Sequence, residues 1–373
     1  MKIFHHKGMA ITHHYQVSFT TTQRVVYAMF VFYLCILKFD EMKHISIIIP
    51  AGNSIIDTII APYNLLIMAN TYYRRIHKSD KAPFKIDLVG LSEDPVQYQK
   101  LFSVTPTTTI YKVEHTDLII VTAISGNLEK EIKNNAAYIP WIKKQRIEND
   151  TEIASLCKGA FLLAETGLLN GKSCSTHWTA QNQFVNRYPK VNLIPEKIIS
   201  EDNGIYSSGG AYSFLNFMLY LIEKFYGREV AIRCSKVSEI DFDRIDQSQF
   251  IIFSGQKEHR DEAIKEAQLY IEKNFNNNLN INEIASMVNV SSRSFLRRFK
   301  KATSNTPMEY IQRVKIEAAK KKLEAYTLNI QEVMYDVGYS DEKAFRNTFR
   351  KYSGLSPLEY RKKYNREMAF AAI

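Results

Sequence analysis

The feature that most constrains this chain is a repeat within its last third. Residues 281–289 correspond to residues 49 positions further on, and residues 295–310 to residues 50 positions further on. The matched pairs are Ile281/Ile330, Ile284/Val333, Ala285/Met334, Asn289/Gly338, Phe295/Phe345, Phe299/Phe349, Pro307/Pro357, Glu309/Glu359 and Tyr310/Tyr360. Matches at a fixed spacing imply two copies of one supersecondary unit.

Each copy predicts a short helix, a tight turn and a second helix. The short helices are expected at about 281–287 and 330–337, and Ser291 and Asp341 are suited to cap the helices that follow. A hydroxyl, Pro and Glu then recur as Thr306-Pro307-Met308-Glu309 and Ser356-Pro357-Leu358-Glu359, which fixes the start of a further helix in each copy. This is helix-turn-helix anatomy.

Helical spacing decides which side chains of the second helices could reach DNA. Phe295, Phe299 and Ala302 form a buried stripe in the first copy, and Phe345 and Phe349 do so in the second. The candidate DNA-binding residues on the opposite faces are Arg293, Leu296, Arg297, Lys300, Lys343, Arg346, Asn347 and Arg350. Guanidinium and amide groups can pair with guanine and adenine edges in the major groove. One such face could be merely solvated, but two at repeat-related positions favour a DNA interface.

The distribution of charge supports this prediction. The net charge is +10, of which residues 1–41 contribute +2, residues 42–258 contribute +1 and residues 259–373 contribute +7. A basic final third joined to a nearly neutral body indicates a polyanion-binding module attached to a domain that needs no such partner.

The middle of the chain predicts an α/β domain. Short β-rich runs at 44–50, 84–90, 116–123 and 152–156 alternate with helical stretches from Ser54 to Asn70 and from Gly126 to about Glu148. Such alternation predicts a mostly parallel sheet covered on both faces. Ligands gather at the carboxyl ends of the strands in these sheets.

Cys157 follows the last of these strands and precedes a helix. An N-terminal helix position lowers the pKa of a thiol and favours the thiolate. The alternative is that Cys157 is a small buried hydrophobic residue. The segment SSGGAY (207–212) is a second candidate lining of the same site, or a plain connection from strand to helix.

The four cysteines are widely spaced and have no partners at zinc-site spacing, so we expect no disulfide framework, no metal and no cofactor, in a reducing cytoplasm. Residues 25–37 form an apolar run of 13 residues, shorter than the roughly 20 needed to cross a bilayer. The run could instead be the apolar core of a signal peptide, but no small-residue cleavage site follows it. We therefore expect residues 1–41 to be a non-native or disordered extension and the protein to have no membrane partner.

Two stretches of the last third carry a family resemblance. INEIASMVNVSSRSFLRRFKK and IQEVMYDVGYSDEKAFRNTFRKYSGLSPLEYR resemble the twin helix-turn-helix domain of AraC/XylS-type regulators. The resemblance implies a long helix from Pro307 to about Leu323 between the units, and recognition helices in successive major-groove turns about 34 Å apart. Asn289 stands where the first turn often has Gly, and Met334 replaces a usually small residue.

The middle of the chain carries a second resemblance. CKGAFLLAETGLLNGKSCSTHW and IIIPAGNSIIDTIIAPYNLLIMAN resemble the PfpI/ThiJ (class I amidotransferase-like) superfamily, and in particular the sensor half of GlxA-like transcriptional regulators. The resemblance implies a flavodoxin-like fold and the catalytic candidates Cys157, His177 as base and Asp57 as orienting acid. Ser155 replaces a frequent Gly, and no His lies two residues before a Glu, so glutaminase activity is not expected.

These observations predict a sequence-specific DNA-binding regulator. The expected organisation is an extension (1–41), a PfpI-like sensor domain (42–235), a partly ordered linker (236–258), an AraC-type domain (259–364) and a tail (365–373). The expected partners are double-stranded DNA, an unknown small-molecule effector, a second copy of the chain as a homodimer, and RNA polymerase. The alternative is a cysteine-dependent hydrolase or hydratase with an accessory DNA-binding domain.

Overall fold

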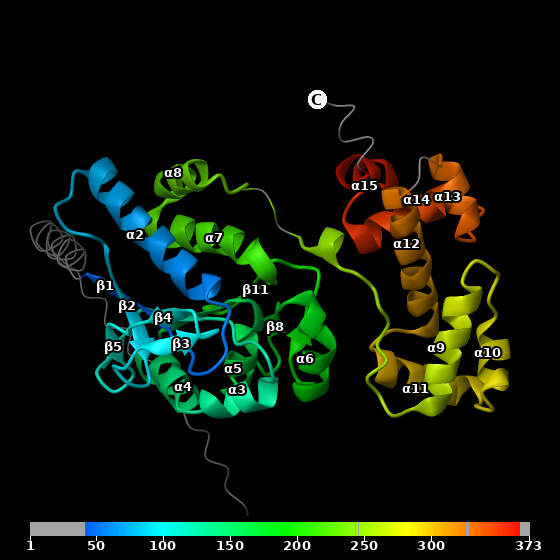
Figure 1. The fold of residues 1–373 in the computed structure, drawn as a ribbon, viewed down its shortest axis with the longest axis horizontal. Coiled ribbons are helices and arrows are strands. Elements are labelled where there is room, and N and C mark those ends of the chain that lie inside the picture. Colours follow the sequence, from blue (N-terminus) through cyan, green and yellow to red (C-terminus); the bar gives the residue numbers. More distant parts are fainter. Residues whose placement is uncertain (1–41, 243, 245, 326–327, 366–373) are drawn as a thin grey trace, which may run out of the picture. The chain divides into compact units, whose positions relative to one another are not determined.

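The computed structural model describes residues 42–242, 244, 246–325 and 328–365 (Figure 1). The expected N-terminal extension therefore lies outside the described residues, as does nearly all of the expected tail. The strands are β1 (Lys43–Ile48), β2 (Phe84–Gly90), β3 (Val96–Tyr98), β4 (Phe102–Val104), β5 (Thr108–Thr109), β6 (Leu118–Val121), β7 (Glu152–Ser155), β8 (Ser173–Cys174), β9 (Asn192–Leu193), β10 (Ile199–Asp202) and β11 (Ile205–Ser208).

The α-helices fall into two groups along the chain. Those of the α/β part are α2 (Asp57–His77), α3 (Leu128–Asn134), α4 (Tyr138–Asn149), α5 (Ala160–Glu165), α6 (Gln181–Arg187), α7 (Phe214–Tyr226) and α8 (Arg228–Ser238). Those of the helical part are α9 (Glu262–Asn274), α10 (Ile281–Met287), α11 (Ser292–Thr303), α12 (Pro307–Ala325), α13 (Ile330–Asp336), α14 (Glu342–Ser353) and α15 (Pro357–Tyr364). The short 3₁₀ segments are η1 (Cys157–Gly159), η2 (Trp178–Ala180), η3 (Ala211–Ser213) and η4 (Ser248–Phe250).

In the described part of the chain, the main sheet has seven strands in the order β10-β11-β7-β6-β1-β2-β5. All neighbours are parallel except β10 and β11. The five strands β1, β2, β6, β7 and β11 therefore lie in the order 2-1-3-4-5 when counted along the chain, which is the flavodoxin-like arrangement. The predicted fold class is confirmed.

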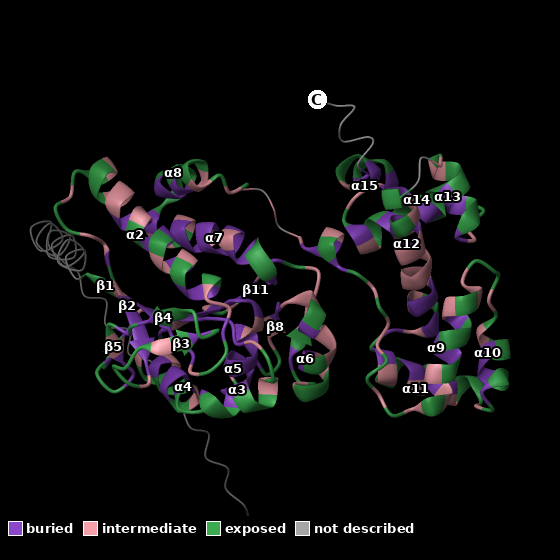
Figure 2. Ribbon diagram, in the orientation of Figure 1, coloured by how far each residue is buried: buried purple, intermediate pink, exposed green. Residues whose placement is uncertain are grey.

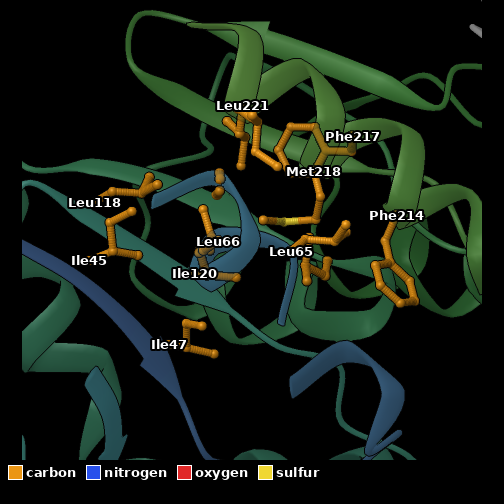
Figure 3. Close-up of a cluster of buried hydrophobic side chains, with 14 of the residues drawn as sticks. Ile45, Ile47, Leu65, Leu66, Leu118, Ile120, Phe214, Phe217, Met218 and Leu221 are labelled. Atoms are coloured by element: carbon orange, nitrogen blue, oxygen red, sulfur yellow. The ribbon is translucent and has the colours of Figure 1, made fainter. Parts of the chain in front are cut away.

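Both faces of this sheet are buried, as the apolar strands require. Ile45 and Ile47 face the layer formed by α2, α7 and α8, where they pack with residues such as Leu66 and Met218 (Figure 3). Alternate residues of the strands, such as Ile119, face the other layer, which includes α4 and α5. Because successive strand residues point to opposite faces, β1, β2, β6, β7 and β11 each contribute to both cores.

The single helix expected from Gly126 to about Glu148 is wrong, because the chain forms α3 and α4 with a break between them. Asn135 lies at this break and is fully buried. Its side chain accepts a hydrogen bond from the backbone N–H of Ala51 (2.8 Å) and donates to the backbone carbonyls of Ala51 (2.9 Å) and Glu131 (2.8 Å). A buried amide that ties α3 to the loop after β1 accounts for the break, and apolar spacing alone does not reveal it.

The last third of the described chain contains the two predicted units, α10–α11 and α13–α14, joined by α12. Each unit has its own core, one centred on Phe295 and Phe299 and the other on Phe345 and Phe349. Asp341 caps α14 through the backbone N–H of Ala344, as predicted.

The turns of the two units differ in detail from the expectation. Ser291 occupies the predicted N-cap position of α11, but its side chain makes no capping hydrogen bond. Asn289 (φ +55°) and Gly338 (φ +76°) are both left-handed at equivalent places in the turns. Asn tolerates this conformation better than most residues with a side chain, which explains its presence where Gly is common.

The expected linker at 236–258 is partly core rather than a loose connection. Its N-terminal boundary falls inside α8, which ends at Ser238. Gln247 and Ser248 are 1% and 2% exposed. The Gln247 side chain accepts from the Gly210 backbone N–H (3.0 Å) and donates to the carbonyl of Pro195 (2.7 Å). Within the described ranges, no helix is long and apolar enough to cross a membrane.

Candidate functional site

The structure places Cys157 at a sharp turn after β7. Cys157 is the first residue of η1, it has φ +52°, and it is completely buried. Its backbone N–H donates to Ser208 Oγ (3.3 Å), and its carbonyl accepts from Thr176 Oγ1 (2.9 Å). A left-handed non-glycine residue is strained and persists only where its surroundings hold it, which is a common property of functional sites.

Gly159 explains how this turn packs against the sheet. A Cβ at Gly159 would lie only 2.2 Å from the carbonyl oxygen of Val121 on β6. Only glycine therefore allows the first turn after Cys157 to approach the neighbouring strand so closely. Gly159 lies two residues after Cys157, whereas Ser155, which replaces a frequent Gly, lies two residues before it.

Of the two interpretations of Cys157, the structure agrees with the small buried residue and not with a lowered thiol pKa. Burial raises the pKa of the thiol above its ordinary value, although backbone N–H groups of Ala211 and Lys158 and the charge of Lys158 act in the opposite direction. The desolvation of a fully enclosed thiolate outweighs the favourable N–H groups of the turn. Burial of Cys157 therefore favours the thiol over the thiolate.

His177 is near this region but is engaged elsewhere. It is the N-cap of η2, where Nδ1 accepts from the backbone N–H of Thr179 (3.1 Å) and lies 2.8 Å from Thr179 Oγ1. Burial, together with the charge of Lys158, lowers the pKa of His177 and favours the neutral imidazole. A Cβ at Gly210 would lie 2.1 Å from the imidazole ring, so His177 packs directly on the Gly-rich turn.

Asp57 lies at the first position of α2 and is exposed. Its carboxylate accepts a hydrogen bond from the Tyr212 hydroxyl (3.1 Å) and raises the pKa of that phenol. Among the described residues, no hydrogen bond joins Cys157, His177 and Asp57 to one another. The structure therefore does not assemble the three candidates into a hydrogen-bonded triad.

The segment SSGGAY lines this region, as one of its two interpretations expected. Ser208 contacts the Cys157 backbone, and Ala211 directs its N–H towards the thiol. A cavity of about 260 Å³ opens beside the turn. Its lining residues are Trp178, Gly210, Ala211, Tyr212, Ser213, Arg244, Gln247 and Phe250. The ranges that the structure covers hold no group of three or more His, Cys, Asp or Glu side chains placed to bind a metal ion.

Sequence reasoning missed Gln247 and Arg244 in this cavity. Both come from the segment taken as a linker, far along the chain from Cys157. A single glutamine or arginine in a polar stretch carries no periodic or motif signal, so only the tertiary structure reveals them.

The second candidate site is the pair of helices α11 and α14. All eight candidate DNA-binding residues are exposed, whereas the four Phe residues of the same helices are completely buried (Figure 2). Thr306 and Ser356 each exchange hydrogen bonds with the Glu three residues later, so α12 and α15 begin where the sequence predicted. The fold thus presents two equivalent polar faces, each directly after a helix-turn-helix turn.

Comparison with known families agrees with this architecture. Residues 63–224 match the model of the DJ-1/PfpI family, and residues 284–363 match the model of a helix-turn-helix domain. The chain therefore combines a region that matches the DJ-1/PfpI family with a helix-turn-helix domain, in the order that the two sequence resemblances predicted.

The proteins that this chain is similar to include transcriptional regulators of Pseudomonas aeruginosa. The chain is 26% identical to the HTH-type transcriptional regulator GbdR over 216 residues, which cover 56% of this chain and 57% of GbdR. It is 27% identical to the HTH-type transcriptional regulator ArgR over 230 residues, which cover 61% of this chain and 69% of ArgR. The chain thus spans 57% of the length of GbdR. Among solved structures, Drosophila melanogaster DJ-1beta is 18% identical, with 54% of this chain and 100% of that chain covered and a TM-score of 0.45.

Proposed function

We propose that this protein is a sequence-specific DNA-binding transcriptional regulator. The observation that carries the proposal is the presentation of two basic, exposed faces by two helix-turn-helix units, each anchored by buried Phe residues. The eight exposed residues on α11 and α14 are the proposed DNA contacts. The half-site spacing of about 34 Å expected for such units follows from one turn of duplex DNA.

The DJ-1/PfpI domain is proposed to bind a small effector and to form a homodimer rather than to catalyse a reaction. The buried thiol of Cys157 has a raised pKa, and His177 uses Nδ1 to cap η2. Neither group is prepared for nucleophilic catalysis at neutral pH. The cavity beside Gly210 is the proposed effector site.

The remaining parts of the proposal concern organisation. Residues 42–235 are proposed as the sensor domain, extended to Ser238 by the end of α8, and residues 259–364 as the DNA-binding domain. The proposed location is the cytoplasm, where duplex DNA and RNA polymerase are accessible partners. The proposal includes neither a cofactor nor a membrane partner.

The test is selection of duplex oligonucleotides from a random pool by the full chain. The expected result is a recurring motif whose affinity falls steeply as salt rises. The Lys and Arg side chains of the protein release counterions from the DNA phosphates, and this release is less favourable at higher salt. Replacing Arg346 by Ala should cost about 1–3 kcal/mol on the selected site and relax one position if Arg346 reads a base. Recovery of no motif would refute the proposal.

The enzymatic alternative is favoured by one observation, the strained turn at Cys157 with two backbone N–H groups directed at the sulfur. The two functions make different predictions for the Cys157→Ser variant. For a sensor, the wild-type chain has no amidase or isonitrile hydratase turnover to lose. A turnover that disappears in Cys157→Ser would support the enzyme.

A further inference from the structure

The recognition helices α11 and α14 differ in whether their exposed cations lie beside carboxylates. On α11, the exposed cations Arg293, Arg297 and Lys300 form no ion pair with any described residue. Together with Leu296, Lys301 and Thr306 they line an open groove of about 720 Å³. Arg293 and Arg297 therefore have no ion pair to give up when a phosphate approaches, whereas the charge of Lys300 helps to lower the pKa of Glu309.

On α14, Arg346 and Arg350 lie beside acids, whereas Lys343, which corresponds to Arg293, forms no ion pair with any described residue. Arg346 donates from Nε to Glu342 Oε1 (2.7 Å), and its Nη2 lies 2.5 Å from the same oxygen. Arg350 Nη2 lies 3.9 Å from the Glu359 carboxylate. Arg346 and Glu342 remain 55% and 45% exposed, so this pair lies on the surface that would face DNA.

The repeat shows where this difference originates. At the offset of 50 residues, Glu342 corresponds to Ser292 and Arg346 corresponds to Leu296. The i,i+4 pair of acid and guanidinium therefore exists only in the second unit. In the first unit, the Ser292 hydroxyl donates to Asn282 Oδ1 (2.7 Å), and Leu296 presents an apolar side chain that is 45% exposed.

The physical consequences for DNA binding are opposite. An unpaired cation can pair favourably with a phosphate of any DNA sequence, and so it adds affinity without selectivity. A carboxylate on α14 repels phosphates of every sequence and so lowers non-specific affinity. The same carboxylate restrains the guanidinium of Arg346, whose remaining donors can still address the O6 and N7 atoms of a guanine.

From this asymmetry, and given the proposed function, we propose a division of labour between the two units. The α11 face anchors the protein on the phosphate backbone with little sequence preference. The α14 face selects the sequence through Arg346, and Glu342 acts as a positioning residue that holds Arg346 and weakens binding to other sequences.

The test compares full-length variants on a duplex selected by the wild-type chain and on a scrambled duplex of equal length. In Glu342→Gln, affinity for the scrambled duplex should rise while affinity for the selected duplex does not, so the ratio of the two should fall by roughly threefold or more. In Lys300→Ala, both affinities should fall equally, and the slope of log affinity against log salt should shrink by about 1.

The mirrored variant Ser292→Glu is the matched control, because it adds the acid to α11, where no arginine stands four residues later. It should weaken both duplexes equally and leave their ratio unchanged. An unchanged ratio in Glu342→Gln on a selective wild-type protein would overturn this inference alone. A wild-type chain that prefers no duplex would overturn the proposed function as well.

Discussion

The turn of the second helix-turn-helix unit provides a sharp test of how the structure is held. Gly338 has φ +76°, and a Cβ added there would lie 2.1 Å from the backbone carbonyl oxygen of Asn276 and 2.9 Å from Lys315 Nζ. Lys315 donates its own hydrogen bond to the Gly338 carbonyl (2.8 Å). The backbone oxygen cannot move aside as a flexible side chain could, so Gly338→Ala forces the turn and the loop after α9 apart.

The cost has two parts. A left-handed conformation costs a non-glycine residue roughly 1–2 kcal/mol, and overpacking typically adds about 1–3 kcal/mol. Gly354 separates the two parts, because it is also left-handed (φ +71°) but its nearest neighbour would be 3.5 Å away, an ordinary contact. We therefore expect roughly 2–5 kcal/mol for Gly338→Ala and only the first part for Gly354→Ala.

Hydrogen exchange followed by mass spectrometry measures these costs locally in the full chain. Peptides from α13 and α14 should exchange roughly 30- to 4000-fold faster in Gly338→Ala, since about 1.4 kcal/mol corresponds to a factor of ten. The acceleration in Gly354→Ala should be at least fivefold smaller. Equal acceleration in the two variants would refute the assignment of the Asn276 contact as the cause.

Three further predictions follow from buried groups. Phe349→Ala should destabilise the second unit by about 3–5 kcal/mol, seen as a lower denaturation midpoint, because Phe349 is completely buried against Tyr360; a change below 1 kcal/mol would contradict this packing. Alkylation of Cys157 by iodoacetamide at pH 7.5 should be slower in the native chain than in urea, because burial raises the thiol pKa; an equal rate would contradict it. Burial lowers the pKa of His177 below its ordinary value of 6.5, so the unfolded chain binds the proton first as the pH falls. Stability should therefore decline from pH 7 to pH 5 more in the wild type than in His177→Gln. Equal declines in the two proteins would contradict this prediction.

The sequence predicted the helical part well because its signals are local. The repeat is visible in the order of the residues alone. The Pro and Glu that start α12 and α15, and the spacing of Phe295 and Phe299, each depend on residues only a few positions apart. Exposure of the eight candidate DNA-binding residues follows directly from this periodicity. The missing cap at Ser291 is a detail of side-chain geometry, which residue type alone does not determine.

The sequence predicted the α/β sheet well but its candidate site poorly. Strand positions follow from apolar runs, whereas the environment of Cys157 depends on segments from distant parts of the chain. Helix position suggested a lowered thiol pKa, but complete enclosure by the fold reverses the sign. Gln247 reaches the Gly-rich turn from a stretch with no hydrophobic pattern, so its burial could not be foreseen.

The central claim is that α11 and α14 place cations and amides on one DNA duplex in a sequence-dependent way. The most direct measurement is the affinity of the full chain for its selected duplex and for a scrambled duplex between 50 and 200 mM salt. Binding through six or more phosphate contacts predicts a loss of about a thousandfold or more over this range, with the selected duplex preferred throughout. Affinities that do not change with salt, or that are equal for the two duplexes, would contradict the account.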